Sequence, residues 1–269
     1  MHLLPYGKIR HWFSFVTGMV LLQIVWGVHW IHTPITTIVA YFMLRYSPRD
    51  QVQHILPTFL MAYLAMAHFQ HQYHTENVMG VDLYFTCSQM IITQKLYMLA
   101  YNLHDGYLLS QNQKGGKQDD TLKNNNALKA ATKCSEWALY ECPTLLELLG
   151  YSFCFSSVLV GPAIEFAHYR NACDGSLHYY TDENGTQQLR GKKIPSNVIP
   201  TLIPFVKCFF LVVFNAFFDR ACNYRRLASP FFFNLSFRQR LFYNWLTNFV
   251  QRMKVYFTWL IAEGCNNIW

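Results

Sequence analysis

The chain has 269 residues, of which 52% are apolar and 14% are charged. A soluble domain carries about 25% charged residues, so this sequence has too little charge to cover a water-facing surface. The same apolar content excludes a disordered or collagen-like chain. The eight cysteines form no Cys-x-x-Cys pair, which argues against a zinc ribbon or a disulfide scaffold. The composition therefore favours a membrane protein.

The first apolar segment lies in a stretch without Asp, Glu, Lys or Arg, between Arg10 and Arg45. Residues 12–31 within it are long enough to cross a bilayer as a helix. A signal peptide is the alternative interpretation, because Lys8 and Arg10 precede the apolar run. No small-residue cleavage site closes the run and further apolar segments follow, so we expect a membrane-spanning helix here.

Four further apolar segments follow, and several of them contain one or two ionisable residues. Their approximate limits are 51–75, 78–103, 144–166 and 198–218. The mean hydropathy of the whole chain is only +0.07, because His, Tyr, Gln and Asn dilute these segments. Such dilution is typical of helices that pack around a polar interior. We therefore predict an all-α fold, a polytopic transmembrane helical bundle.

Local signals indicate where two of these segments begin or end. Thr144 followed by Glu147 is a capping box that opens the fourth segment, and Gly161-Pro162 ends its regular part. We expect Gly106 to close the third segment, because glycine takes the left-handed conformation that ends helices.

Two polar stretches separate the apolar segments and are expected to lie outside the membrane, at about 107–141 and 170–197. The second carries the glycosylation sequon that begins at Asn184, and another sequon begins at Asn234. A sequon matters only on the lumenal side. Lys and Arg occur in both stretches, so their charge bias leaves the topology open.

A different kind of helix is predicted at about 237–254. Apolar side chains recur there with helical spacing, while Arg and Lys fill the other face. Such a helix lies in the membrane interface, with its basic side against lipid phosphate or an anionic ligand. The alternative is a bundle helix with one solvated face. The next residues, 255–262, are apolar again and could re-enter the membrane.

Eleven histidines raise the question of a metal site, and His68, His71 and His74 have the best spacing for one. A membrane di-iron enzyme needs several such clusters, so we predict no metal site and keep a metal oxidoreductase only as an alternative. We find no nucleophile elbow, P-loop or Rossmann glycine pattern. No nucleic-acid binding is expected, because the basic residues cluster at the ends of apolar segments.

Lys95 lies inside the third segment, where an unpaired charge costs about 2.5 to 3.5 kcal/mol on insertion scales. Asp82, Glu147 or Glu165 could neutralise it in an ion pair between helices. The functional alternative is that Lys95 contacts an anionic group of a substrate.

Three stretches resemble the membrane-bound O-acyltransferase family, in particular its lysophospholipid acyltransferase branch. They are MIITQKLYMLAYNLHDG at 90–106, PTLLELLGYSFCFSSVLVGP at 143–162 and MKVYFTWLIAEG at 253–264. A weaker match runs from Arg10 to Gly18, so the resemblance extends over nearly the whole chain. It implies a multi-pass protein of the endoplasmic reticulum membrane, with many slanted helices around a tunnel.

The resemblance also implies a reaction, in which the acyl group of acyl-CoA passes to the free hydroxyl of a lysophospholipid. In the family a histidine acts as general base and an asparagine assists, without metal, cofactor or covalent intermediate. Those residues lie in Trp-His-Gly and Trp-Asn motifs, and neither motif occurs in this sequence. We therefore assign no histidine as catalytic. We expect a single partial transmembrane domain over 1–269, the N-terminal half of the family fold and inactive alone.

Matching to the family's motifs indicates five candidate substrate-binding residues. Trp259, Glu263 and Asn267 come first, and Lys95 and Asp105 follow; each could instead be a structural polar contact between helices. The expected partners are acyl-CoA, a lysophospholipid and membrane lipids. The main rival is a non-catalytic membrane protein that binds lipid or acyl-CoA, or that dimerises with itself or a full-length relative and modulates it. The headgroup and acyl-chain preferences stay open.

Overall fold

The computed structural model describes residues 5–74, 85–114, 126–176, 179–181, 187–189 and 196–267. The chain divides into two compact units. Of the described residues, the first contains 5–74, 85–114, 126–176, 179–181 and 187–189, and the second contains 196–267. Within the described ranges, both units are helical apart from one short β-hairpin in the first.

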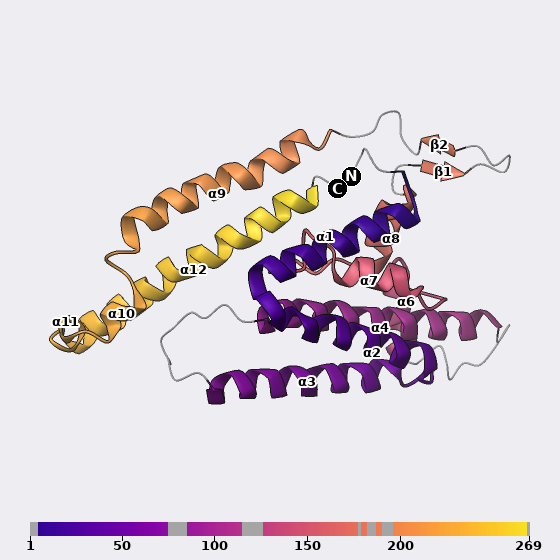
Figure 1. Ribbon diagram of the computed structural model, residues 1–269, viewed down its shortest axis with the longest axis horizontal. Coiled ribbons are helices and arrows are strands. Elements are labelled where there is room, and N and C mark those ends of the chain that lie inside the picture. Colours follow the sequence, from indigo (N-terminus) through magenta and orange to yellow (C-terminus); the bar gives the residue numbers. More distant parts are fainter. Residues whose placement is uncertain are drawn as a thin grey trace. The chain divides into compact units, whose positions relative to one another are not determined.

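Helices that lie against one another form the first unit (Figure 1). In chain order its elements are α1 (Lys8–Trp26), η1 (Gly27–Ile31), α2 (His32–Tyr46), α3 (Val52–His74), α4 (Thr86–Lys114), α6 (Asn126–Lys133), α7 (Leu145–Ser152), α8 (Phe166–Asp174), β1 (Tyr179–Thr181) and β2 (Gln187–Leu189). The two strands pair antiparallel, with Tyr179 opposite Leu189. α3 lies beside α4, and α1 packs against α7.

Two helical stretches of the described residues are long and apolar enough to cross a membrane. One is Lys8–Tyr46, which joins α1, η1 and α2, and the other is α9 (Val198–Phe218). They coincide with the first and fifth predicted segments. The helical character of the fold is therefore confirmed, while a bundle of more spans stays a prediction.

The fourth predicted segment is not one helix. Its capping box is confirmed, because the Glu147 N–H donates to Thr144 Oγ1 and the Thr144 N–H donates to Glu147 Oε2. α7 then ends at Ser152, and turns lead to α8. The regular part thus ends well before Gly161, whose φ of 86° marks a further turn of the chain.

A backbone contact explains why α7 packs so closely on α1. A Cβ added to Gly18 would lie 1.7 Å from the carbonyl oxygen of Phe153, so only glycine allows this approach. Ser14 adds a hydrogen bond from its hydroxyl to the Gly150 carbonyl at 2.9 Å. Large aromatic side chains fill the buried core around this contact, namely Tyr151, Phe153, Phe166 and Tyr169.

Gly106 does not end α4, contrary to the prediction. The helix continues to Lys114, and α6 also lies inside the stretch expected to be a polar loop. The reason is a backbone crossing: the Leu139 N–H donates to the Asn102 carbonyl at 2.9 Å, and a Cβ on Gly106 would lie 2.0 Å from the Leu139 oxygen. Glycine therefore provides close approach here and no turn.

The second unit is a hairpin of two long helices, α9 and α12 (Phe237–Asn267), which run side by side (Figure 1). Two short helices, α10 (Tyr224–Leu227) and α11 (Pro230–Phe233), lie in the connection between them. The predicted amphipathic helix at 237–254 and the apolar residues 255–262 are one continuous helix. The apolar run therefore extends the basic helix and is not a separate segment.

Candidate functional site

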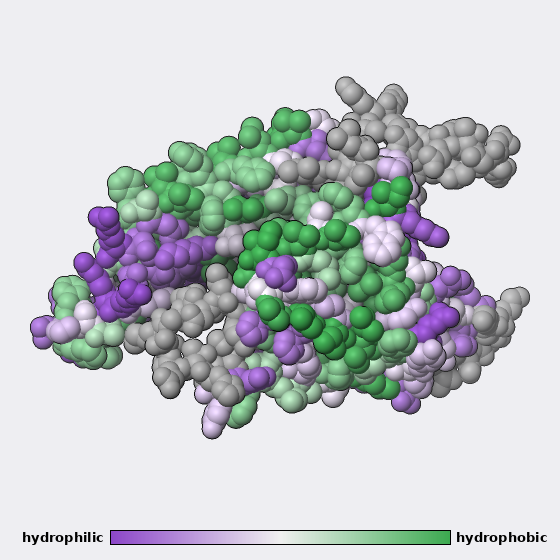
Figure 2. All heavy atoms as spheres, viewed as in Figure 1, coloured by the Kyte–Doolittle hydropathy of each residue, from purple (hydrophilic) through white to green (hydrophobic). Residues whose placement is uncertain are grey.

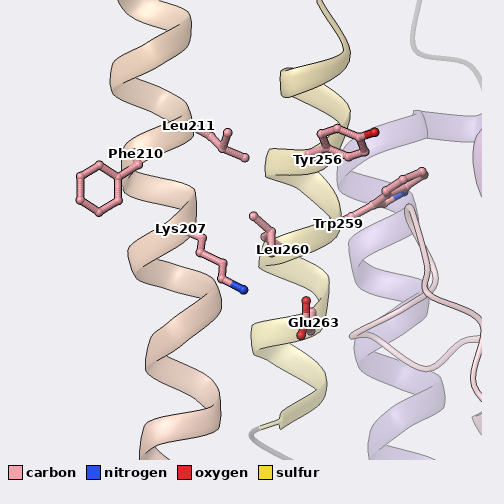
Figure 3. A pocket seen from close by; sticks show the side chains of 7 residues that line it. All are labelled: Lys207, Phe210, Leu211, Tyr256, Trp259, Leu260 and Glu263. Carbon is pink, nitrogen blue, oxygen red and sulfur yellow. The ribbon is translucent and has the colours of Figure 1, made fainter. Parts of the chain in front are cut away.

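A groove lies between α9 and α12 of the second unit (Figure 3). Its volume is about 540 Å³, and it is lined by Lys207, Phe210, Leu211, Tyr256, Trp259, Leu260 and Glu263. Small-molecule sites typically measure about 300 to 1,000 Å³, so the groove is large enough for part of a lipid.

Helical spacing places these side chains along the groove. On α12, Tyr256, Trp259 and Glu263 follow one another at intervals of three and four residues, so they share one side of the helix. On α9, Lys207 and Leu211 are four residues apart and both extend toward α12, whereas the Phe210 ring extends from the other side of α9 (Figure 3). The groove is thus built on two helices, which hold its side chains more firmly than loops would.

The lining combines apolar walls with one charge of each sign. Figure 3 shows the Lys207 side chain extending from α9 toward α12, on the side where Glu263 lies. Among the described residues neither of them forms an ion pair, so both charged groups are available to a ligand. The rings of Tyr256 and Trp259 lie beside each other, with centroids 5.8 Å apart at an angle of 50°.

Polar contacts at one end hold the two helices in register. Lys254 Nζ lies 2.7 Å from the Asp219 carboxylate, and Gln251 Nε2 donates to the same carboxylate at 2.9 Å. These two donors lower the pKa of Asp219 below its ordinary value. Further along, the Cys208 thiol donates to the Phe257 carbonyl at 3.5 Å. The contacts fix which residues face each other across the groove.

Comparison with known proteins assigns the chain to a family. Its sequence matches the membrane-bound O-acyltransferase family over residues 51–267, which include both helices of the groove. The chain belongs to this family. The resemblance found in the three sequence stretches is thereby confirmed.

Curated relatives of this family cover nearly all of the chain. Lysophospholipid acyltransferase 6 of Drosophila melanogaster is 25% identical over 97% of this chain and 34% of that protein. Membrane-bound glycerophospholipid O-acyltransferase 2 of Gallus gallus is 24% identical over 96% of this chain and 48% of that protein. Lysophospholipid acyltransferase 5 of Bos taurus is 25% identical over 94% of this chain and 46% of that protein. The chain thus spans about a third to a half of the length of these relatives.

The candidate residues fall into both units of this O-acyltransferase chain. Trp259 and Glu263 line the groove, and the structure adds Lys207 opposite them. Asn267 lies on the same helix, whereas Lys95 and Asp105 lie on α4 in the first unit. The structure therefore brings together two of the five predicted residues.

Asn267 has a structural partner on α9. Its Nδ2 donates to the carbonyl oxygen of Pro200 at 2.9 Å. That carbonyl lacks its usual intrahelical donor, because the residue four positions later is Pro204, which has no backbone N–H. The amide of Asn267 therefore satisfies an acceptor that the proline leaves open.

Lys95 is fully buried in the first unit, where it caps a helix. Its Nζ donates to the carbonyl oxygens of Tyr151 at 2.9 Å and Ser152 at 3.3 Å. These carbonyls belong to the last turn of α7, where the helix offers unpaired acceptors and the negative end of its dipole. The helix end thus supplies the counter-charge for Lys95.

The predicted ion pairs of Lys95 with Glu147 or Glu165 are wrong. Glu147 instead pairs with Arg170 at 3.2 Å, and Glu165 accepts a hydrogen bond from Asn102 at 2.8 Å. The third expected partner, Asp82, lies outside the described residues. Sequence spacing could not reveal this, because the carbonyls that Lys95 meets come from a distant helix end.

Histidine ligands do not gather in the described part of the chain. No group of three or more His, Cys, Asp or Glu residues that could hold a metal occurs there. His68 lies on α3, whereas the side chains of His71 and His74 are outside the described residues. The predicted cluster itself therefore remains untested.

Sequence reasoning missed Lys207 and Tyr256 as lining residues. Tyr256 lies three residues before Trp259, so helical periodicity could have added it to the candidate face. Lys207 is the single ionisable residue of the fifth predicted segment, and an intramembrane charge by itself suggests a functional site. Its position opposite Glu263 depends on the register of α9 on α12, which only the folded hairpin shows.

Proposed function

We propose that this chain holds the lipid substrate of a membrane acyltransferase, which moves an acyl chain from acyl-CoA to the free hydroxyl of a lysophospholipid. Two observations support the proposal. The chain belongs to the membrane-bound O-acyltransferase family. Proteins whose sequences match nearly the whole length of this chain are named as lysophospholipid or glycerophospholipid acyltransferases. The reaction itself is inferred by analogy, and the groove supports the proposal because its size and lining suit part of a lipid.

The groove between α9 and α12 carries the structural part of the argument. Leu211 and Leu260 offer apolar surface to an acyl chain, and burial of such a chain is favourable in proportion to its area. The Lys207 ammonium is suited to a phosphate oxygen, as lysine is a frequent phosphate binder. Trp259 and Glu263, which belong to the family-like stretch 253–264, complete the site from the other helix.

The other candidate residues have weaker support from the structure. Asn267 and Lys95 bind backbone carbonyls of this chain, and Asp105 is half-buried on α4. A direct contact of these three with substrate stays a prediction.

The proposed location is the endoplasmic reticulum membrane, as a multi-pass protein. The family is a family of membrane-bound proteins, and two helical stretches of this chain are apolar enough to cross a bilayer. Dimerisation, with itself or with a full-length relative, stays a prediction.

The proposal is tested in microsomes that contain the protein, by measuring both the binding of a series of lysophospholipids and acyl transfer from labelled acyl-CoA. Lys207→Met and Glu263→Gln are compared with the native protein. Loss of one charge-assisted hydrogen bond costs about 1.5 to 3 kcal/mol, so the dissociation constant for the lysophospholipid should rise roughly tenfold or more. Unchanged dissociation constants in both variants would contradict a substrate site in the groove.

A second candidate function is binding of lipid or acyl-CoA without transfer, with modulation of a full-length relative. It is favoured by one observation: the groove is complete within α9 and α12, although the sequence lacks the Trp-Asn and Trp-His-Gly motifs. Microsomes that bind lysophospholipid but show no acyl transfer, and in which Lys207→Met weakens that binding, would support this function over the first.

A further inference from the structure

Because of the way α9 packs along α12, the end of the hairpin where the two helices are connected lies beyond the apolar helix α9. α9 has 21 residues and is therefore about 31 Å long, close to the thickness of a bilayer's hydrocarbon core. Asn267 bonds Pro200 near one end of α9, and Lys254 pairs with Asp219 just past the other end. Residues 237–248 of α12 thus continue past the end of α9, together with the connection 219–236.

This end of the hairpin is folded and ordered by its own contacts. The hydroxyl of Tyr243 donates to the Ala221 carbonyl, and the hydroxyl of Tyr224 donates to Asn248 Oδ1 at 3.3 Å. Arg240 Nε donates to the Leu235 carbonyl at 2.8 Å. These bonds fold α10 and α11 back onto α12. We call residues 220–245 the cationic tip.

The cationic tip carries positive charge without any acidic residue. The sequence has no Asp, Glu or His between positions 220 and 262, whereas it has Arg220, Arg225, Arg226, Arg238, Arg240, Arg252 and Lys254. Four arginines of the tip are exposed, namely Arg220, Arg225, Arg226 and Arg238. Among the described residues none of these four pairs with a carboxylate.

The cationic tip also carries exposed aromatic side chains. The most exposed is Phe237 at 80%, and Phe231, Phe233, Phe242 and Trp245 are all more than half exposed. Figure 2 shows hydrophilic atoms gathered toward this end of the hairpin, next to hydrophobic ones. Aromatic rings and arginines together are typical of the headgroup layer of a membrane, where one part of the side chain is apolar and the other wet.

We propose that the cationic tip binds the phosphates of anionic phospholipids in the cytosolic leaflet. An arginine guanidinium matches phosphate oxygens with paired donors, and an anionic leaflet attracts cations close to its surface. The four exposed arginines are spread over α10, α12 and the residue after Asp219, an arrangement that suits a surface of many headgroups. We assign the tip to the cytosolic side because residues 220–240 carry five arginines, one basic residue more than residues 170–197 before α9, and short cytosolic loops carry the Lys and Arg excess. The inference needs α9 to span the bilayer, but it needs no acyl transfer.

Lipid retention by the purified full chain tests the proposal. The chain is reconstituted in vesicles of phosphatidylcholine mixed with phosphatidylserine, extracted with mild detergent, and its bound lipids are counted by mass spectrometry. We expect enrichment of phosphatidylserine, which the double variant Arg225→Gln/Arg226→Gln lowers by roughly fivefold for each cation removed. The matched control is Lys129→Gln/Lys133→Gln on α6, which also removes two exposed charges and should leave the enrichment unchanged.

Three results would overturn the proposal. One is unchanged enrichment in the arginine double variant, and another is an equal loss in the lysine control. The third comes from a parallel sample to which coenzyme A is added: retention of coenzyme A in place of phosphatidylserine, dependent on Arg225 and Arg226, would show that the tip binds a nucleotide phosphate. The variant Arg225→Lys/Arg226→Lys keeps the charge and should keep most of the enrichment; a loss as large as that of the glutamine pair would show that charge is not the cause.

Two natural sequons test the side of the membrane. They begin at Asn184 and Asn234, before and after α9, so a spanning α9 puts them on opposite sides. We expect an N-glycan that Asn184→Gln removes and Asn234→Gln does not. If neither natural sequon is glycosylated, a tag that carries a sequon is inserted before α9 in one variant and after α9 in another. A glycan on the Asn234 side, in either form, would overturn the cytosolic assignment.

Discussion

Two neighbouring phenylalanines of α9 give a matched test of the groove. Phe209 and Phe210 are each 66% exposed, yet only Phe210 lines the groove. A phenylalanine side chain can bury about 150 to 250 Å², so a bound acyl chain could cover about 60 Å² of what remains exposed on Phe210. At about 25 cal/mol per Å² this contact contributes about 1.5 kcal/mol. Phe210→Ala should therefore weaken lysophospholipid binding roughly tenfold, and Phe209→Ala should leave it nearly unchanged.

Binding of a fluorescent lysophosphatidylcholine to the full chain in detergent micelles provides the assay. Because the two variants remove the same side chain from the same helix with the same exposure, a general loss of helix stability would affect both alike. Equal dissociation constants for Phe209→Ala and Phe210→Ala, whether weakened or not, would refute the assignment of the groove as the lipid site.

Three further predictions concern contacts inside the first unit, at Lys95 and Gly106, and inside the second, at Asp219. Lys95→Met removes the ammonium donor from the last carbonyls of α7, so thermal unfolding of the purified chain should show a loss of about 1 to 3 kcal/mol, which Lys95→Arg should restore in part; equal stability of Lys95→Met and the native chain would contradict the capping role. Gly106→Ala places a Cβ against the Leu139 backbone and should destabilise the first unit by about 1 to 3 kcal/mol in the same assay, whereas tolerance would show that the crossing is loose. Asp219 has a lowered pKa in the folded chain, so its ion pair stabilises the hairpin above the unfolded pKa near 3.8 and this stabilisation is lost as pH falls through the lower folded value. Because both partners are partly exposed, Asp219→Asn should cost only about 0.5 kcal/mol at neutral pH and nothing at the acid end; a cost that persists in acid would disprove the ionic contribution.

Local and periodic features of the sequence were predictable. The Thr144 capping box depends on residues three positions apart, and the apolar segments at 12–31 and 198–218 depend on composition alone, so both features appear in the structure where they were expected. The same periodicity on α12 also brings Trp259 and Glu263 into one groove.

Contacts between distant backbones could not be predicted in this way. Gly106 has the sequence context of a helix end, but it lies inside α4 because Leu139 crosses there. Lys95 similarly has plausible carboxylate partners in the sequence, whereas the folded chain offers it a helix end that is closer. In both cases the packing of one helix against distant backbone decides which groups meet. The register of that packing cannot be read from the sequence.

Photocrosslinking of the lipid tests the central claim most directly. A lysophospholipid with a diazirine in its acyl chain is bound to the native full chain, activated by light, and its adducts are located by peptide mass spectrometry. The groove between α9 and α12 predicts adducts within residues 207–211 and 256–263, and it predicts that excess unlabelled lysophospholipid removes them. Adducts confined to other helices, or adducts at the groove that unlabelled lipid does not displace, would contradict the account.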